Sequence, residues 1–304
     1  EGTHAIAHAN GLGSTSGATT VSTNASLNIS NGITVAEPIT INGTGVSSGG
    51  AIRLTSGNNT YSGAITLNSN SSIVSNSGVQ IISGAINGSI SNSYSLTITA
   101  TDNLTLSGTI GATAPPTSLT VTTTCDATCS GASRTGVLAL NANVTTSSDQ
   151  TYTAAGNITI NADRTLTSSS GTITTNSALS GAYSLTIAGN AAFGDGTGTD
   201  TINLSGTSKN LSVSGTTIIK TDITTSGTQT YSGAVTLGAA TTLTTTNSNV
   251  TFNGTLNSDG ATPRNLTAAL GTGTLVIGDS SADTVGATNA LGAIAITEIG
   301  RAHV

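Results

Sequence analysis

The stretch Thr230-Tyr231-Ser232-Gly233-Ala234-Val235-Thr236-Leu237 decides the fold of this chain, because the chain contains it more than once. It recurs almost unchanged as residues 60–67 and, with more substitutions, as residues 151–160. The chain therefore holds about three copies of one unit, which start near residues 60, 151 and 230. Repetition on this scale in a chain without helical patterns is typical of an array or a solenoid.

Short strands are predicted throughout by a triplet of aliphatic, small polar and aliphatic residues, which places both aliphatic side chains on one face. Leu27-Asn28-Ile29, Ile65-Thr66-Leu67 and Leu211-Ser212-Val213 are examples. Each triplet ends in a turn sequence such as Asn31-Gly32. Short strands with frequent turns fit either a β-sandwich array or a parallel β-helix. The small aliphatic core residues favour an all-β, single-stranded parallel β-helix (β-solenoid) with coils of about 20 residues.

Three regions are expected along the chain. Residues 1–17 lack periodicity and are predicted to be irregular, whereas residues 18–297 form the β-helix. Residues 298–304 differ from the Ser/Thr/Gly-rich composition of the preceding chain and resemble a translated sequencing adapter, so we interpret them as a non-native tail. Neither end carries a polar cap, and we therefore interpret the chain as a fragment of a longer protein. Pro115 and Pro116 cannot lie in a central strand, so residues 111–117, like 125–134, are predicted to form loops.

The composition argues against several function classes. Charged residues are 7% of the chain, the net charge is −6, and the seven Lys and Arg residues are scattered. Nucleic-acid binding depends on clustered cations, so it is not expected. No run of about 20 apolar residues exists, and membrane insertion of this region is not expected either. We predict no cofactor.

All five tyrosines belong to repeated motifs. Tyr61, Tyr152 and Tyr231 lie in the motif described above, and Tyr94 and Tyr183 open a second motif, Tyr-Ser-Leu-Thr-Ile. If four coils make one unit, equivalent tyrosines lie about 19 Å apart. We predict these five residues as binding candidates, because an exposed aromatic ring can stack on a sugar. The alternative is that each ring fills a wide corner of a coil.

A few further residues suggest local chemistry. Cys125 and Cys129 are too few for zinc, which takes four ligands, and we predict a local disulfide. Asp195 and Asp200 flank a Gly-rich stretch and form a weak calcium candidate, although a plain turn is the preferred interpretation. His4 and His8 lack a third ligand, so no metal site is predicted there.

Two other functions are known for β-helices, namely polysaccharide cleavage and ice binding. Polysaccharide lyases and hydrolases need clustered carboxylates, but most aspartates here sit in turn sequences. Outward pairs such as Thr97-Ile98-Thr99 are similar to those of ice-binding solenoids. Such solenoids need threonine pairs that recur at the coil length on one flat face, and the spacing here is irregular. Neither function is therefore our first expectation.

The stretch Gly227–Leu243 and the motif Tyr94–Ile98 resemble repeats of filamentous haemagglutinin-like adhesins, which are very large bacterial exoproteins of two-partner secretion systems, and of related autotransporter passengers. The resemblance spans residues 18–297. It implies a right-handed β-helix, export through an outer-membrane transporter, and a place in the secreted or cell-surface part of an adhesin that serves adhesion or biofilm formation.

We therefore expect a rod segment that binds host or neighbour-cell glycans or matrix by multivalent contact, without catalysis. The alternatives are a β-helical polysaccharide lyase or hydrolase, and a self-associating matrix or sheath protein.

Overall fold

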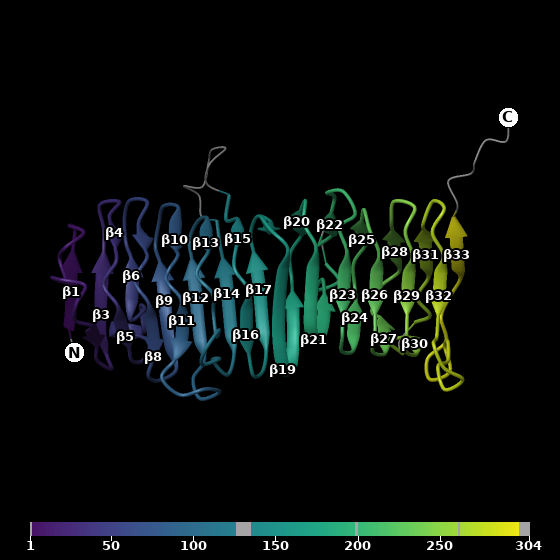
Figure 1. Ribbon diagram of the computed structural model, residues 1–304, viewed down its shortest axis with the longest axis horizontal. Coiled ribbons are helices and arrows are strands. Elements are labelled where there is room, and N and C mark those ends of the chain that lie inside the picture. Colours follow the sequence, from purple (N-terminus) through teal and green to yellow (C-terminus); the bar gives the residue numbers. More distant parts are fainter. Residues whose placement is uncertain (1, 126–134, 198–199, 261, 298–304) are drawn as a thin grey trace. The chain divides into compact units, whose positions relative to one another are not determined.

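The chain is a parallel β-solenoid, as predicted. A computed structural model describes residues 2–125, 135–197, 200–260 and 262–297, and every strand pairing recorded in these ranges is parallel (Figure 1). The only helical element in the described ranges is a single turn of 3-10 helix, η1 (Val46–Ser48). The chain divides into two compact units, residues 1–159 and 160–304.

The first unit is a stack of coils with three faces, and each face is a parallel ladder of short strands. Face A consists of β1 (Gly2–Ile6), β3 (Ala25–Ile29), β6 (Ile52–Leu54), β9 (Ser71–Ser75), β12 (Leu96–Ala100), β14 (Leu119–Thr123) and β17 (Gln150–Ala154). Face B consists of β2 (Thr19–Val21), β5 (Ile39–Ile41), β8 (Ile65–Leu67), β11 (Ile86–Gly88), the bridge residue Ile110 and β16 (Val144–Thr146). Face C consists of β4 (Thr34–Val35), β7 (Thr60–Tyr61), β10 (Gln80–Ile82), β13 (Leu104–Leu106), β15 (Leu138–Leu140) and β18 (Ile158–Thr159).

The second unit has the same construction. Face D begins with the first parts of β19 (Arg164–Thr175) and β21 (Leu185–Phe193) and continues with β23 (Leu211–Val213), β26 (Gln229–Tyr231), β29 (Val250–Phe252) and β32 (Leu275–Ile277). Face E takes the second parts of β19 and β21, then β24 (Thr217–Ile219), β27 (Val235–Leu237) and β30 (Leu256–Ser258). Face F consists of β20 (Leu179–Gly181), β22 (Ile202–Leu204), β25 (Ile223–Thr225), β28 (Thr241–Thr244), β31 (Leu266–Ala269) and β33 (Ile294–Thr297).

The core of each unit is filled by the aliphatic residues of the predicted triplets. In Leu27-Asn28-Ile29 the two aliphatic side chains are buried and Asn28 is half-exposed, and Leu211-Ser212-Val213 repeats this pattern. Each fully buried Leu, Ile or Val contributes about 1.5–3 kcal/mol relative to an exposed one. The alternation predicted from the sequence is therefore confirmed, and it leaves Thr, Ser and Asn on the outside.

The coils differ in length more than the predicted value of about 20 residues allows. Paired residues are 18 positions apart between Leu211 and Gln229, but 34 apart between Ile110 and Val144. Within the described ranges, the extra residues of long coils lie outside the strands. Residues 111–117, with Pro115 and Pro116, form such a loop, as predicted. Loops can vary freely in length because only the strands must keep their register.

Residues 1–17 are not wholly irregular, so this part of the prediction is wrong. Gly2–Ile6 forms β1 and pairs with β3 over five residues. Only Ile6 of this strand is buried, at 5% exposure. A strand whose side chains stay largely exposed carries no hydrophobic alternation, and its pairing rests on backbone hydrogen bonds that the sequence pattern does not reveal. The predicted non-native tail, residues 298–304, lies outside the described residues.

The Ser-Gly step of the repeated motif forms a tight corner in both units. In the first unit Gly63, Gly84 and Gly108 follow strands of face C and stack upon one another. A Cβ atom on Gly84 would overlap the carbonyl oxygen of Gly63, and one on Gly108 would overlap that of Gly84. The corner therefore excludes every residue except glycine. Gly233 stacks on Gly215 in the same way in the second unit.

Candidate functional site

Three of the five predicted binding tyrosines are buried in the core. Tyr61 is 1% exposed, and Tyr152 and Tyr231 are 0% exposed. A ring without exposed surface cannot stack on a sugar, so the prediction is wrong for these three. The rings fill the inside of the coil, as the alternative required, but from strands β7, β17 and β26 and not from a corner. Tyr231 stacks on Phe252 with ring centroids 5.2 Å apart.

The tyrosines of the repeated motif also lie on different faces of their coils. Tyr61 lies on face C, where it pairs with Ile82, whereas Tyr152 lies on face A of the same unit, where it pairs with Val121. The expected ladder of equivalent tyrosines at about 19 Å spacing is therefore wrong for this pair. The physical reason is the variable loop length, which makes the sequence repeat differ from a whole number of coils.

A buried glutamine explains why tyrosine fits inside. The Tyr152 hydroxyl hydrogen-bonds Oε1 of Gln150 at 2.8 Å, and the Tyr231 hydroxyl bonds Oε1 of Gln229 at 3.1 Å. The amide nitrogen of Gln229 in turn donates to the Thr244 carbonyl at 3.0 Å. Buried polar groups of this kind are costly unless they are paired. The spacing Gln-x-Tyr thus supplies a tyrosine together with its internal partner.

Asn59 replaces the glutamine beside Tyr61, and the network changes accordingly. Asn59 is one methylene shorter, and its amide nitrogen donates to the Ser56 carbonyl at 2.9 Å. The Tyr61 hydroxyl donates to the Glu37 carbonyl at 2.7 Å instead. Burial raises the pKa of Tyr61, Tyr152 and Tyr231 far above the ordinary value, because the charged phenolate would be desolvated.

These buried phenols predict a loss of stability in alkali. An unfolded tyrosine loses its proton above pH about 10, whereas the folded protein retains it. The unfolded state then binds fewer protons, so stability falls as pH rises, by about 1.4 kcal/mol per pH unit for each buried tyrosine. Urea unfolding at about pH 8 and about pH 11 measures this slope. A variant with Tyr152→Phe and Tyr231→Phe is expected to show a shallower slope, and an unchanged slope would contradict the explanation.

Tyr94 and Tyr183 are half-buried, so each has a surface that a ligand can reach. Tyr94 precedes β12, and its carbonyl accepts a hydrogen bond from the Thr117 amide at 2.8 Å. It therefore lies beside the proline-containing loop. For these two residues the binding role stays a prediction.

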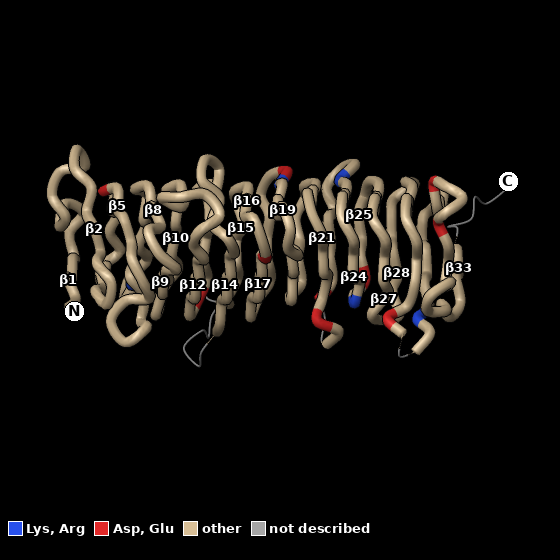
Figure 2. Tube along the Cα trace, turned by 90° about the horizontal axis from the view of Figure 1, so that it is seen from below, with Lys and Arg blue, Asp and Glu red and all other residues tan. Residues whose placement is uncertain are grey.

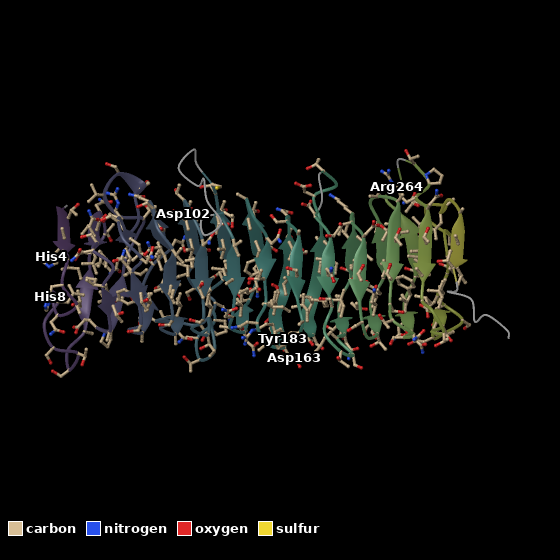
Figure 3. The ribbon with its side chains drawn as sticks, turned by 90° about the horizontal axis from the view of Figure 1, so that it is seen from above. His4, His8, Asp102, Asp163, Tyr183 and Arg264 are labelled. Atoms are coloured by element: carbon tan, nitrogen blue, oxygen red, sulfur yellow. The ribbon has the colours of Figure 1, made fainter. Side chains whose placement is uncertain are left out.

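Tyr183 lies at the one place in the described ranges where an accessible aromatic ring meets a cation. The Lys209 ammonium nitrogen is 5.6 Å from the centre of the Tyr183 ring. The same nitrogen is 3.7 Å from Oδ1 of Asp163. Figure 3 shows Tyr183 and Asp163 close together at the edge of the second unit. We call Asp163, Arg164, Tyr183 and Lys209 the Tyr183 corner.

Consecutive coils hold the Tyr183 corner by hydrogen bonds that run from one coil to the next. The Ser184 amide donates to Oδ1 of Asp163 at 2.8 Å, and the Asn210 amide donates to the Ser184 hydroxyl at 3.1 Å. The Arg164 guanidinium donates to Oδ1 of Asn161 at 2.5 Å. Its partial burial lowers the pKa of Arg164, and the Asp163 carboxylate opposes this effect. The corner thus offers a ring, two cations and hydrogen-bonding groups on one edge.

Sequence reasoning found Tyr183 but missed its neighbours. Asp163 and Lys209 are 20 and 26 residues from Tyr183, and these distances match no fixed coil length. Only the strand register shows that Asp163 and Lys209 are neighbours of Tyr183, since Leu185 pairs with both Arg164 and Leu211. A coil of about 20 residues would have placed Asp163 at this corner but would have missed Lys209.

Asp195 and Asp200 lie in the segment between β21 and β22. The Asp195 carboxylate accepts hydrogen bonds from the amide and the hydroxyl of Thr197, both at 2.7 Å, and these bonds lower its pKa. The Asp200 carboxylate accepts the Asp195 amide at 3.1 Å, while burial raises its pKa. The turn interpretation accounts for both contacts, and the calcium site stays a prediction. No group of three or more potential metal ligands occurs in the described part of the chain.

The remaining predicted residues add no site. Cys125 is disulfide-bonded, and Cys129 lies outside the described residues. His8 Nδ1 accepts the Asn10 amide at 3.2 Å in an exposed turn, and His4 lies on the exposed strand β1 (Figure 3). No helix in the described ranges has the length and hydropathy to cross a membrane.

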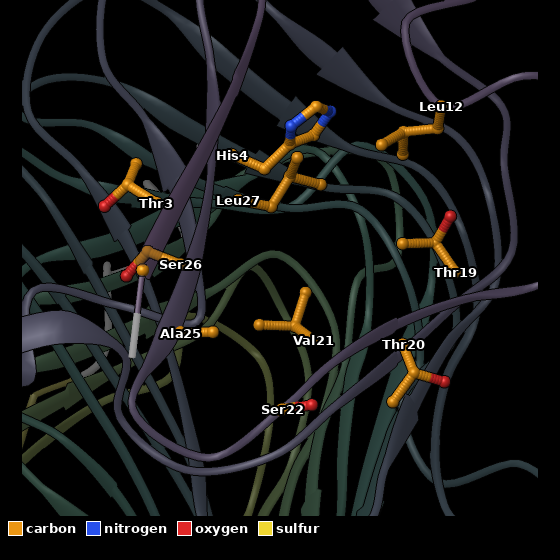
Figure 4. A pocket seen from close by; sticks show the side chains of 11 residues that line it. Thr3, His4, Leu12, Thr19, Thr20, Val21, Ser22, Ala25, Ser26 and Leu27 are labelled. Carbon is orange, nitrogen blue, oxygen red and sulfur yellow. The ribbon is translucent and has the colours of Figure 1, made fainter.

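A cavity of about 520 Å³ lies between β1, β2 and β3. Figure 4 shows Val21 and Leu27 on its wall, with Leu12 and His4 beside them. Val21 and Leu27 belong to the same inward columns as the core. The cavity is therefore the inside of the first coil, and we assign it to the fold.

The fold defines the chain as a β-solenoid protein, with the Tyr183 corner as its best candidate site. Comparisons with protein-family models, with curated proteins and with solved structures found no match.

Proposed function

We propose that this chain is a rod segment of a large exported bacterial adhesin that binds glycans by repeated weak contacts. The observation that supports this most directly is the Tyr183 corner, where an accessible ring, two cations and a carboxylate lie on one edge. Sugars are bound by stacking on aromatic rings and by charged or polar side chains around them. The resemblance to filamentous haemagglutinin-like repeats supports the same function.

The outer surface of the second unit is suited to multivalent contact. Thr186, Ser212, Thr230 and Thr251 stack outward in register on face D. Such rows offer hydroxyl groups at every coil, about 4.8 Å apart. Contacts that are individually weak add up when many occur on one chain or on neighbouring chains. Location at the cell surface and export through an outer-membrane transporter belong to the same proposal.

We also propose binding without catalysis. Charged residues lie mostly at turns (Figure 2). Some gather in small groups, as at the Tyr183 corner and around a pocket lined by Asp200, Lys220 and Asp222. In that pocket the carboxylates of Asp200 and Asp222 accept hydrogen bonds from the backbone amides of Asp195 and Thr242. Several are held by local bonds, such as Arg264, whose side chain forms two hydrogen bonds with the Asp259 carboxylate. A hydrolase would need two carboxylates facing one bond of the substrate. The arrangement in the described ranges is more typical of turn formation.

Tyr183→Ala is expected to weaken glycan binding about fivefold to tenfold, because one aromatic stacking contact contributes about 1 kcal/mol. A glycan array, followed by titration of the best ligand, measures the effect. Thr186→Ala is the matched control, since Thr186 is exposed on the same coil but carries no ring. Equal affinity of both variants and the natural chain would contradict a binding role for the Tyr183 corner.

A further inference from the structure

Face A of the first unit carries six threonines in a regular two-dimensional array, which we call the threonine array. The strands β12, β14 and β17 each present an outward Thr-x-Thr pair. Their pairing places Thr97, Thr120 and Thr151 in one column and Thr99, Thr122 and Thr153 in a second. Between the columns the inward residues Ile98, Val121 and Tyr152 are buried.

The regularity of the array is not visible in the sequence. The pairs are 23 residues apart between Thr97 and Thr120, but 31 apart between Thr120 and Thr151. The expectation that irregular spacing prevents a threonine array is therefore wrong for these three coils. The strands keep the same register although the two coils differ in length.

The spacing within the array follows from the geometry of a parallel sheet. Threonines in one column are about 4.8 Å apart, and the two columns are about 6.6 Å apart. Threonine is branched at Cβ, so its methyl and hydroxyl groups occupy few rotamers on a strand. Water molecules on the surface of ice repeat at spacings close to these two values. The array is therefore a rigid, repeating template of hydroxyl and methyl groups.

The side chains of the array are accessible. Thr97 and Thr120 are exposed, and Thr99, Thr122 and Thr151 are half-exposed. For Thr97, Thr99, Thr120 and Thr122 the described part of the chain supplies no hydrogen-bond partner to the hydroxyl group. Charged side chains are absent from these three strands. A neutral surface on which these four hydroxyl groups are unengaged suits a ligand made only of water.

The neighbouring coil marks the boundary of the array. On β9 the position beside Thr97 is Ser72, which is only 7% exposed and donates to the Thr44 carbonyl at 3.3 Å. The loop that contains Thr44 and η1 packs against this part of face A. The array thus begins where the loop ends, on a part of the face that no described segment covers.

From this geometry we propose that the threonine array binds ice, by ordering a layer of water that matches the ice lattice. Ordering water molecules costs entropy, and a rigid template lowers this cost because the protein groups are already in place. This function is separate from glycan binding at the Tyr183 corner, and either can fail without the other.

The test is inhibition of ice recrystallisation by the purified chain, together with binding to a growing ice surface. Thr120→Lys places a long charged side chain at the centre of the array and is expected to raise the inhibitory concentration at least about tenfold, equivalent to about 1.4 kcal/mol. Thr66→Lys is the matched control, because Thr66 is an outward, half-exposed threonine on face B. It is expected to leave the activity unchanged.

Circular dichroism shows whether both variants fold. If Thr120→Lys does not fold, Thr120→Val is tested in its place, because it changes the side chain less. Absence of any effect of the natural chain on ice would overturn the proposal, as would equal losses in Thr120→Lys and Thr66→Lys. Retention on crystalline cellulose or chitin that depends on Thr120, without an effect on ice, would also overturn it and would assign the array to a polysaccharide surface.

Discussion

Tyr231→Ala is expected to destabilise the second unit by about 3–5 kcal/mol, the range found when a large buried aromatic residue is truncated. Tyr231 is 0% exposed and stacks on Phe252. Its removal leaves a cavity on the inside of face D and takes away the partner of Gln229. The remaining buried oxygen of Gln229 then lacks its hydrogen bond, which adds to the loss.

Urea unfolding followed by circular dichroism measures this effect, and hydrogen exchange locates it in the second unit. Tyr231→Phe separates the two contributions, since it keeps the ring and removes only the hydroxyl. We expect it to cost about 1–2 kcal/mol. Thr236→Ala, a change on the outside of face E, is expected to stay within about 0.5 kcal/mol of the natural chain. A Tyr231→Ala variant as stable as Thr236→Ala would show that the ring is not part of the core.

Gly84→Ala is expected to destabilise the first unit by about 2–3 kcal/mol, although it adds only one methyl group. The added Cβ would overlap the carbonyl oxygen of Gly63 on the coil beside it, and Gly108 packs against Gly84 from the other side. The backbone cannot move away without breaking the hydrogen bonds of the corner, such as that from the Gly84 amide to the Tyr61 carbonyl at 3.2 Å.

Gly17→Ala is the matched control for this steric effect. A Cβ on Gly17 meets no atom within 4 Å. We expect this change to be neutral or to stabilise by up to about 1 kcal/mol, because alanine restricts the unfolded chain. Thermal unfolding of the two variants side by side gives the comparison. If Gly84→Ala unfolds at the same temperature as Gly17→Ala, the coils are not in contact at this corner.

The fold could be predicted from the sequence because the deciding signal is local. A triplet such as Ile65-Thr66-Leu67 indicates by itself which side chains turn inward, and an Asn-Gly or Ser-Gly step indicates where the strand ends. The same logic fails for β1, where His4 and its neighbours stay exposed. Apolar and polar residues alternate along a strand because one of its faces is buried. A strand with little buried surface therefore shows no such alternation in its sequence.

The candidate sites could be predicted only in part, because they combine residues from different coils. Sequence reasoning identified Tyr183 as a candidate, yet it treated Tyr231 in the same way although that ring is buried. A tyrosine in a strand faces inward or outward according to its position relative to the neighbouring aliphatic residues. Tyr231 and Tyr183 each lie two positions from a buried residue, Gln229 and Leu185, so the alternation alone gives them the same side. They differ because Tyr231 lies inside β26, whereas Tyr183 lies before the first residue of β21, and the alternation does not indicate where a strand begins.

The sequence by itself determined the all-β class, the strand triplets, the glycine corners and the loop at Pro115 and Pro116, since each depends on interactions between residues close in the chain. Only the tertiary structure decided which residues from different coils become neighbours, as with Lys209 beside Tyr183 and Thr120 beside Thr151. The physical reason is that a solenoid fixes the register of its strands and leaves the length of its loops open. Distance along the chain therefore does not report distance between coils.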